Sequence, residues 1–196
     1  MIVDKIFELC NGVPHTGHHA TLVNLLFEAQ IEAARNNNNI SKNAAILASV
    51  GNGRFTSACI SAISTLGGIH APVSEARVVI YRDRSGIRKA LKRGELIPGF
   101  GNSFYKEGID PAFNKFYGYA EANFPDITAG IMGAREIILF ETGLDIHPNA
   151  AAFTALTAEA IGLPYGLEPL LLIIPRSIVW AEVFVANRPN KPLFIP

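Results

Sequence analysis

Residues 148–164 read PNAAAFTALTAEAIGLP. Small and apolar residues at helical spacing follow the proline, and Gly162 and Pro164 come after this run. A glycine followed by a proline marks the end of a helix. The stretch therefore predicts a helix over residues 149–161.

The same three- and four-residue spacing of apolar residues recurs along nearly the whole chain, and no run alternates over the length of a strand. Asp110 and Pro111 have the order of an N-cap and a first helical residue. We therefore predict an all-α fold, with helices over residues 2–10, 18–35, 42–49, 55–65, 72–82, 85–93, 111–124, 128–142, 149–161 and 177–186.

The composition limits the possible partners. The 196 residues include 17 basic and 17 acidic side chains, and this balance argues against a nucleic-acid groove and a polybasic membrane surface. Because 49% of the residues are hydrophobic and only 17% are charged, we expect an oligomer, most simply a homodimer. Cys10 and Cys59 form no paired motif, which fits a reducing cytoplasm and predicts neither a disulfide nor a zinc site.

Residues 167–186 are apolar and about as long as a membrane span. Glu168, Arg176 and Glu182 inside the segment would be costly in lipid, so we predict a buried core helix with a break near Pro175. Residues 1–9 lack the basic start and long apolar run of a signal peptide. A cytoplasmic protein without a membrane span is expected.

Three loops lie between predicted helices: GGIHAP at 67–72, GFGNSFYK at 99–106 and PNAAAF at 148–153. In this order they resemble the active-site loops of the citrate synthase and citryl-CoA lyase family, and the resemblance extends from about Asn43 to the C terminus. It implies a two-lobed helical fold with a truncated large lobe, formed by residues 1–70 and 165–196, and a small lobe over 71–164. It also implies a coenzyme A thioester as substrate, without a metal.

In the first loop, His70 matches the family histidine that donates a hydrogen bond to the thioester carbonyl. Removing a proton beside a thioester places charge on that oxygen, and a preorganised donor stabilises the charge. The alternative is a histidine near a helix start that packs at a lobe junction, since Pro72 has the place of a first-turn proline.

In the second loop, Asn102 occupies the position of the histidine that protonates the acceptor carbonyl. An amide donates a hydrogen bond but transfers no proton near neutral pH, so Asn102 polarises at most. The resemblance assigns coenzyme A binding to Pro98, Gly99, Phe100 and Gly101. It assigns substrate binding to Ser103, which replaces an arginine, and to Lys106. Ala112 replaces a carboxylate-clamping arginine that no neighbour obviously substitutes, unless Lys106 or Lys115 bends in.

In the third loop, Ala151 occupies the position of the catalytic aspartate, so no base for the alpha-proton stands there. Glu141 and Asp145, upstream of the loop, are the alternative bases. Further on, Arg176 matches an arginine that binds the acceptor's carboxylate; the alternative is an arginine at the core edge paired with Glu168 or Glu182. Lys191 has the place of an arginine that reaches into the partner subunit's site, with a solvated basic tail as the alternative.

His15, His18 and His19 suggest a metal site at first sight, but no acidic or cysteine partner at ligand spacing accompanies them, so a loop or helix-start role is favoured. Two functions stay open. The first is an acyl-CoA-dependent acyltransferase or lyase acting on something other than oxaloacetate. The second is a catalytically inactive binding or partner subunit, with a hetero-oligomer with a longer paralogue as one possible assembly. Standard citrate synthase activity is not expected.

Overall fold

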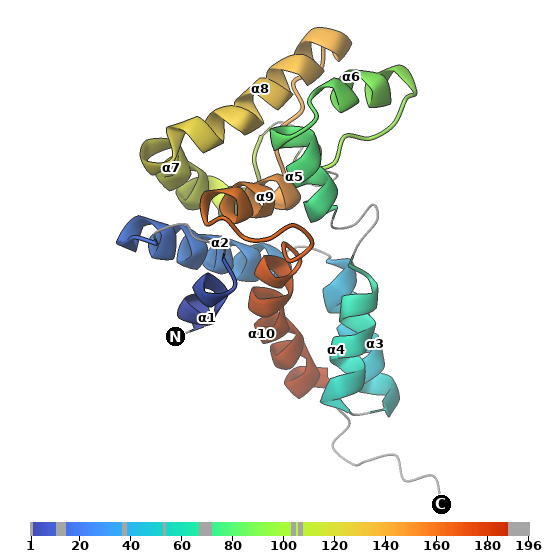
Figure 1. Ribbon diagram of the computed structural model, residues 1–196. Coiled ribbons are helices and arrows are strands. Elements are labelled where there is room, and N and C mark those ends of the chain that lie inside the picture. Colours follow the sequence, from blue (N-terminus) through green and yellow to red (C-terminus); the bar gives the residue numbers. More distant parts are fainter. Residues whose placement is uncertain are drawn as a thin grey trace, which may run out of the picture.

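The structure is a computed structural model that describes residues 2–10, 15–36, 39–52, 54–66, 72–102, 105 and 108–187. Over these residues the regular structure is entirely helical, which confirms the predicted all-α fold. The elements in chain order (Figure 1) are α1 (Ile2–Glu8), α2 (Gly17–Asn36), α3 (Ile40–Asn52), α4 (Phe55–Ser64), α5 (Val73–Tyr81), α6 (Ser85–Lys92), the 3₁₀ helix η1 (Pro111–Phe113), α7 (Asn114–Asn123), α8 (Pro125–Thr142), α9 (Ala150–Ala160) and α10 (Leu170–Asn187).

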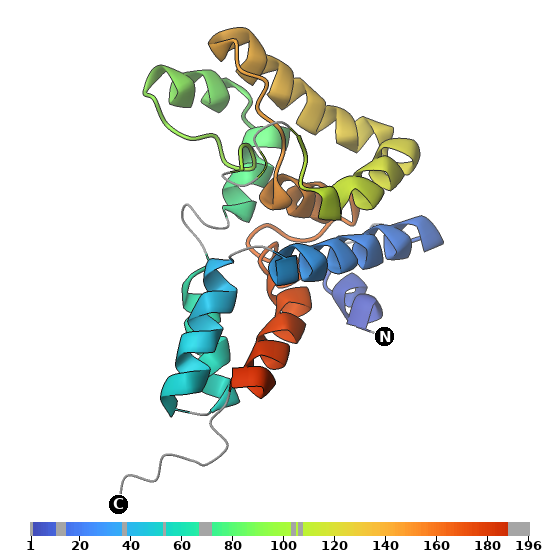
Figure 2. The ribbon, with the colours of Figure 1, turned by 180° about the vertical axis from the view of Figure 1, so that it is seen from behind.

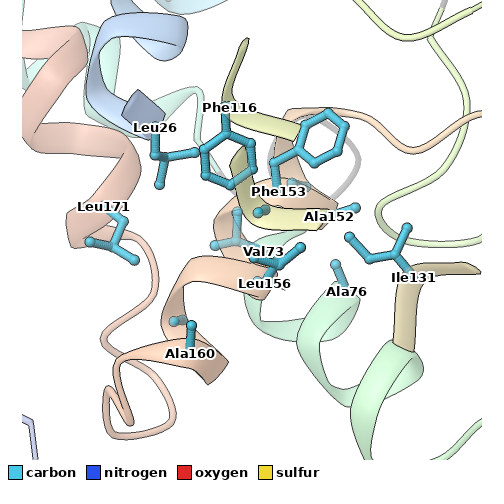
Figure 3. Close-up of a cluster of buried hydrophobic side chains, with 14 of the residues drawn as sticks. Leu26, Val73, Ala76, Phe116, Ile131, Ala152, Phe153, Leu156, Ala160 and Leu171 are labelled. Carbon is cyan, nitrogen blue, oxygen red and sulfur yellow. The ribbon is translucent and has the colours of Figure 1, made fainter. Parts of the chain in front are cut away.

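Helix α9 is the centre of the main core. It is buried from Ala151 through Ala158, because its many alanines let other helices approach it closely on several sides. Helices α2, α5, α8 and α10 all contact it. Figure 3 shows the side chains that meet there, with labels on Leu26, Val73, Ala76, Phe116, Ile131, Ala152, Phe153, Leu156, Ala160 and Leu171.

A second, smaller core joins α3, α4 and α10. Trp180 of α10 packs against Ala45, Ala58 and Ala62, and its indole N–H donates to Ser41 Oγ at 3.3 Å. In both ribbon views (Figures 1 and 2) these three helices lie on the opposite side of α2 from α6 and α8. The division into lobes at residues 71 and 164 stays a prediction.

Several boundaries follow from local chemistry as predicted. The Asp110 carboxylate accepts from the Ala112 amide at 3.1 Å and Pro111 begins η1, which confirms the N-cap. Gly162 closes α9 with a φ of 65°, in the left-handed region that favours glycine. The single helix predicted over residues 111–124 is instead η1 followed by α7, and α8 begins at Pro125, before the predicted start at Thr128.

The predicted break near Pro175 is wrong. Helix α10 begins at Leu170 and runs through Pro175, which lies inside it. A proline removes one backbone hydrogen bond, but residues on both sides of Pro175, including Leu171, Leu172 and Val179, are buried. Packing of this face against α2, α3 and α4 keeps the helix continuous.

Among the described residues one helix, α10, is long and apolar enough to cross a membrane by length and composition. Such a helix is weak evidence for a span, because core helices pass the same test. In this structure α10 packs on α2, α3, α4 and α9 and buries Arg176, whose charge would be costly in lipid. These contacts bury a third of the segment and show α10 packed against other helices of the chain.

Candidate functional site

The second and third loops are joined by their backbones. The Gly101 amide donates to the His147 carbonyl and the Asn149 amide donates to the Gly99 carbonyl, both at 2.9 Å. Phe100 and Pro148 form an antiparallel bridge between these two bonds. Asn149 adds a side-chain bond, from Nδ2 to the Gly101 carbonyl at 2.8 Å. Two loops that lie about fifty residues apart in the chain therefore form one rigid unit.

Gly99 marks the point where this unit meets α5. Its φ is 88°, and a Cβ added there would lie 3.0 Å from the Ala76 Cβ and 3.2 Å from the Ala152 Cβ. Only glycine combines this backbone conformation with this space. Helix α5 follows the first loop in the chain and α9 follows the third, so Gly99 of the second loop contacts the helix after each of the other two loops. His70, Ser103, Lys106 and Lys191 lie outside the described residues, and their assignments stay predictions.

Ala151 and Asn102 each belong to one of the two joined loops. Ala151 is the second residue of α9 and is buried, and its amide donates to the Oδ1 of the N-cap Asn149 at 2.9 Å. Asn102 is half-buried and follows Gly101, which is bonded to that same Asn149. Asn149 thus bonds Ala151 and the residue before Asn102, and a methyl group and an amide occupy the two positions at which the resemblance expects the base and the acid.

The described side chains that were weighed as substitutes for the missing groups have other partners. Ala112 packs against the core. Lys115 was considered as a substitute for the arginine that binds the substrate carboxylate. It is exposed, and its Nζ lies 3.5 Å from Glu28 Oε2. The acidic residues upstream of Ala151 are committed to ion pairs, Glu141 with Arg88 and Asp145 with Arg135. Neither carboxylate is therefore a substitute base.

Arg176 is buried without an acidic partner among the described residues. Its side chain is 8% exposed, and its Nε and Nη2 donate to Gln30 Oε1 at 3.3 and 3.1 Å. The two partners proposed as the alternative are engaged elsewhere: Glu168 with Arg77 and Glu182 with Arg35. Burial lowers the pKa of Arg176 to about 10, so the guanidinium stays charged at neutral pH.

Gln30 is the functional candidate that sequence reasoning missed. It is fully buried, and its Nε2 donates to Thr154 Oγ1 at 3.0 Å. A signal was present in the sequence, because Gln30 follows Leu26 by four residues and thus falls on the apolar stripe of α2. A polar side chain on such a stripe requires a buried hydrogen-bond partner.

A second buried network holds α5 against the segment between α9 and α10, and the sequence analysis did not predict it. Arg77 donates to Glu159 at 2.8 Å, to Glu168 at 2.9 Å and to the Leu163 carbonyl at 2.6 Å. Burial by itself would raise the pKa of Glu168. Hydrogen bonds from Arg77, from Ser74 and from the Gly166 amide outweigh it and hold the pKa below its ordinary value.

The three N-terminal histidines point to three different partners. His15 stacks on Phe7 with ring centroids 4.0 Å apart, and its Nε2 bonds the Ile161 carbonyl at 3.1 Å. His18 bonds the Tyr119 hydroxyl, and His19 Nδ1 accepts from the Thr16 amide. His18 and His19 lie in the first turn of α2. The described residues contain no group of three or more His, Cys, Asp or Glu that could hold a metal ion.

No protein-family model and no curated protein matches the sequence. Solved structures do match. Citryl-CoA lyase from Hydrogenobacter thermophilus superposes with a TM-score of 0.76 at 19% identity, over 100% of this chain and 80% of that chain. ATP citrate lyase from Methanosaeta concilii, in complex with (3S)-citryl-CoA, gives 0.69 at 18% identity, over 90% of this chain and 33% of that one.

Citrate synthase from Thermoplasma acidophilum, in a ternary complex with carboxymethyl coenzyme A and oxaloacetate, gives a TM-score of 0.68 at 18% identity. The match covers 92% of this chain and 51% of that one. Identities this low establish the fold and leave the activity open. The resemblance read from the three loops is confirmed at that level: the chain has the helical fold of citryl-CoA lyase and citrate synthase.

Proposed function

We propose that this protein binds a coenzyme A thioester and acts as an acyltransferase or lyase on a substrate other than oxaloacetate. The observation that carries the proposal is Arg176: a buried, charged guanidinium without an acidic partner among the described residues. An uncompensated buried charge is costly, and a substrate carboxylate would offset the cost. The fold supports the same site, since two of the matched structures contain coenzyme A derivatives.

The residues have separate roles in this proposal. His70 donates to the thioester carbonyl, Asn102 orients the acceptor carbonyl, and Arg176 holds one carboxylate. Coenzyme A lies along Pro98 and the Gly99–Gly101 turn, while Ser103, Lys106 and Lys191 contact the substrate. Because Ala151 cannot accept a proton, the alpha-proton of the thioester is taken up by a group of the substrate or by a residue outside the described part of the chain.

The second candidate is an inactive partner subunit with the same fold. One observation favours it. Gly99 packs so closely against α5 and α9 that no larger residue fits, so the glycine is explained without a ligand. Under this alternative the chain associates with a longer paralogue that carries the acid and the base.

Ligand binding tests the step that the first candidate requires and a partner subunit does not. In thermal-shift measurements, coenzyme A and acetyl-CoA are each expected to raise the melting temperature of the wild type. At a ligand concentration a hundredfold above Kd, binding to the folded state adds about 2.7 kcal/mol of apparent stability. The variant His70→Ala should bind both ligands equally, because it loses the contact to the acyl carbonyl. ADP serves as the nucleotide control. If neither coenzyme A nor acetyl-CoA shifts the melting temperature, the partner-subunit function is the one that remains.

The assembly proposed with the first function is a homodimer. Helices α3, α4 and α10 carry exposed apolar side chains on the described surface, including Leu47 at 74%, Ile60 at 67% and Val185 at 64% exposure. Val50, Ile63 and Ile178 on the same three helices are also exposed. Soluble monomers rarely present so many large apolar side chains on neighbouring elements, and a two-fold axis would bury the same set on both copies.

Charges on this face are expected to separate the copies. The double variant Leu47→Glu/Ile60→Glu should sediment at half the mass of the wild type, because each introduced carboxylate would be buried without a partner. Phe140→Glu is the matched control, since Phe140 is 82% exposed but lies on α8. A double variant that remains dimeric, or a wild type that is monomeric at every concentration, would contradict this interface.

A further inference from the structure

We infer that Gln30 is a positioning residue: it fixes the Arg176 guanidinium through neutral hydrogen bonds and thereby reserves its charge for a single carboxylate of the substrate. The inference rests on the proposed function and adds to it a positioning residue and a substrate class. The class is a small organic acid bound through one carboxylate.

The hydrogen-bond chain fixes the orientation of the amide. A guanidinium only donates, so the side-chain atom of Gln30 that faces Arg176 must be the carbonyl oxygen. The amide nitrogen then points to Thr154, whose hydroxyl donates onward to the Ala150 carbonyl at 2.7 Å. Arg176 on α10 is thus tied through α2 to the first turn of α9.

The first turn of α9 contains Ala151, the position that the resemblance gives to the catalytic aspartate. Thr154 lies three residues after Ala151 and therefore on the same face of α9, one turn away. Ala151 in turn shares the Asn149 cap with the joined loops. Gln30 consequently sets the position of Arg176 relative to the loop where the chemistry is proposed.

The choice of an amide has an electrostatic consequence. A glutamate at this position would accept the same hydrogen bonds from the guanidinium and neutralise its charge. A hydrophobic side chain would leave the guanidinium without these hydrogen bonds. The glutamine holds the guanidinium and leaves its charge uncompensated by any carboxylate among the described residues. Charge complementarity then selects an anion.

The number of carboxylates follows from the rest of the site. The position of a second clamping arginine is Ala112, and Lys115 points to Glu28. One guanidinium holds one carboxylate through two parallel hydrogen bonds, and the lysines proposed to contact the substrate, Lys106 and Lys191, have no such planar fork. A monocarboxylate with a carbonyl for Asn102, such as a 2-oxo acid, therefore matches these groups better than a dicarboxylate does.

The test uses Gln30→Glu in the full chain, with pyruvate and coenzyme A titrated separately by calorimetry. Pyruvate affinity should fall at least about tenfold, because the new carboxylate occupies the guanidinium. The melting temperature should stay the same or rise, and coenzyme A binding should be unchanged. Asn114→Asp, which adds the same charge at an exposed position, should leave pyruvate binding at the wild-type level.

Arg176→Met provides a second, independent variant. It should lose pyruvate binding with little change in melting temperature, because removing a buried charge offsets the cost of leaving Gln30 Oε1 without its donor. A purely structural role for Gln30 predicts the opposite pattern, with lower melting temperatures in both variants and pyruvate binding retained. Wild-type protein that binds coenzyme A but not pyruvate, or Gln30→Glu protein that binds pyruvate normally, would overturn the inference. Failure of coenzyme A to bind would instead count against the proposed function.

Discussion

Purified wild-type protein is expected not to release coenzyme A from acetyl-CoA in the presence of oxaloacetate at a measurable rate. Ala151 cannot accept a proton, and Asn102 cannot donate one near neutral pH. Each proton transfer by a positioned group contributes about a hundred- to ten-thousand-fold, so the loss of both lowers the rate by several orders of magnitude. A coupled thiol assay measures the rate, with citryl-CoA cleavage followed in the same way.

Restoring the family residues tests the reason for this inactivity. Ala151→Asp places a carboxylate in the first turn of α9, where the helix dipole stabilises negative charge. Together with Asn102→His it should give a trace of turnover, and adding Ala112→Arg should increase turnover by holding a second carboxylate. Oxaloacetate-dependent release of coenzyme A by the wild type, abolished in His70→Ala, would show that another group performs the proton transfers.

The variant Arg77→Met is expected to lose about 3–5 kcal/mol of unfolding free energy, because it leaves the carboxylate of Glu168 buried without its counter-ion. Glu168 is fully buried in the structure, and Arg77 is the charged one of two α5 side chains that bond it, beside Ser74. Urea unfolding measures the loss. Arg93→Met is the control, because the Arg93–Glu95 pair is exposed and its removal should leave the midpoint unchanged.

The ionic origin of this loss has its own signature. In the wild type the pKa of Glu168 is lower in the folded state than in the unfolded state, so its contribution is present above the unfolded pKa and disappears as the pH falls through the folded pKa. In Arg77→Met burial dominates and raises that pKa, so the variant should lose less stability on acidification than the wild type. Glu168→Gln in the Arg77→Met background should recover part of the loss. Equal pH dependence in both proteins would argue against the ion pair.

The sequence by itself determined the helices and the family of loops to which the site belongs. Helical periodicity and end signals such as Asp110 with Pro111, or Gly162 with Pro164, act over a few residues, so they are readable without the fold. The substitutions at Asn102 and Ala151 were recognised from the resemblance of the loops to those of the family. The loops around them were expected to come together, and the backbone bonds of Asn149 and Gly101 show how they do.

Tertiary structure alone decided which charges meet. Arg176 was weighed against Glu168 and Glu182, yet both are paired elsewhere, and its partner Gln30 lies 146 residues away on α2. Pro175 likewise looked like a helix break until the burial of its neighbours was known. Local spacing cannot supply these answers, because they depend on which helix faces cross in space. The free energy of a buried side chain is set by those long-range contacts rather than by its neighbours in sequence.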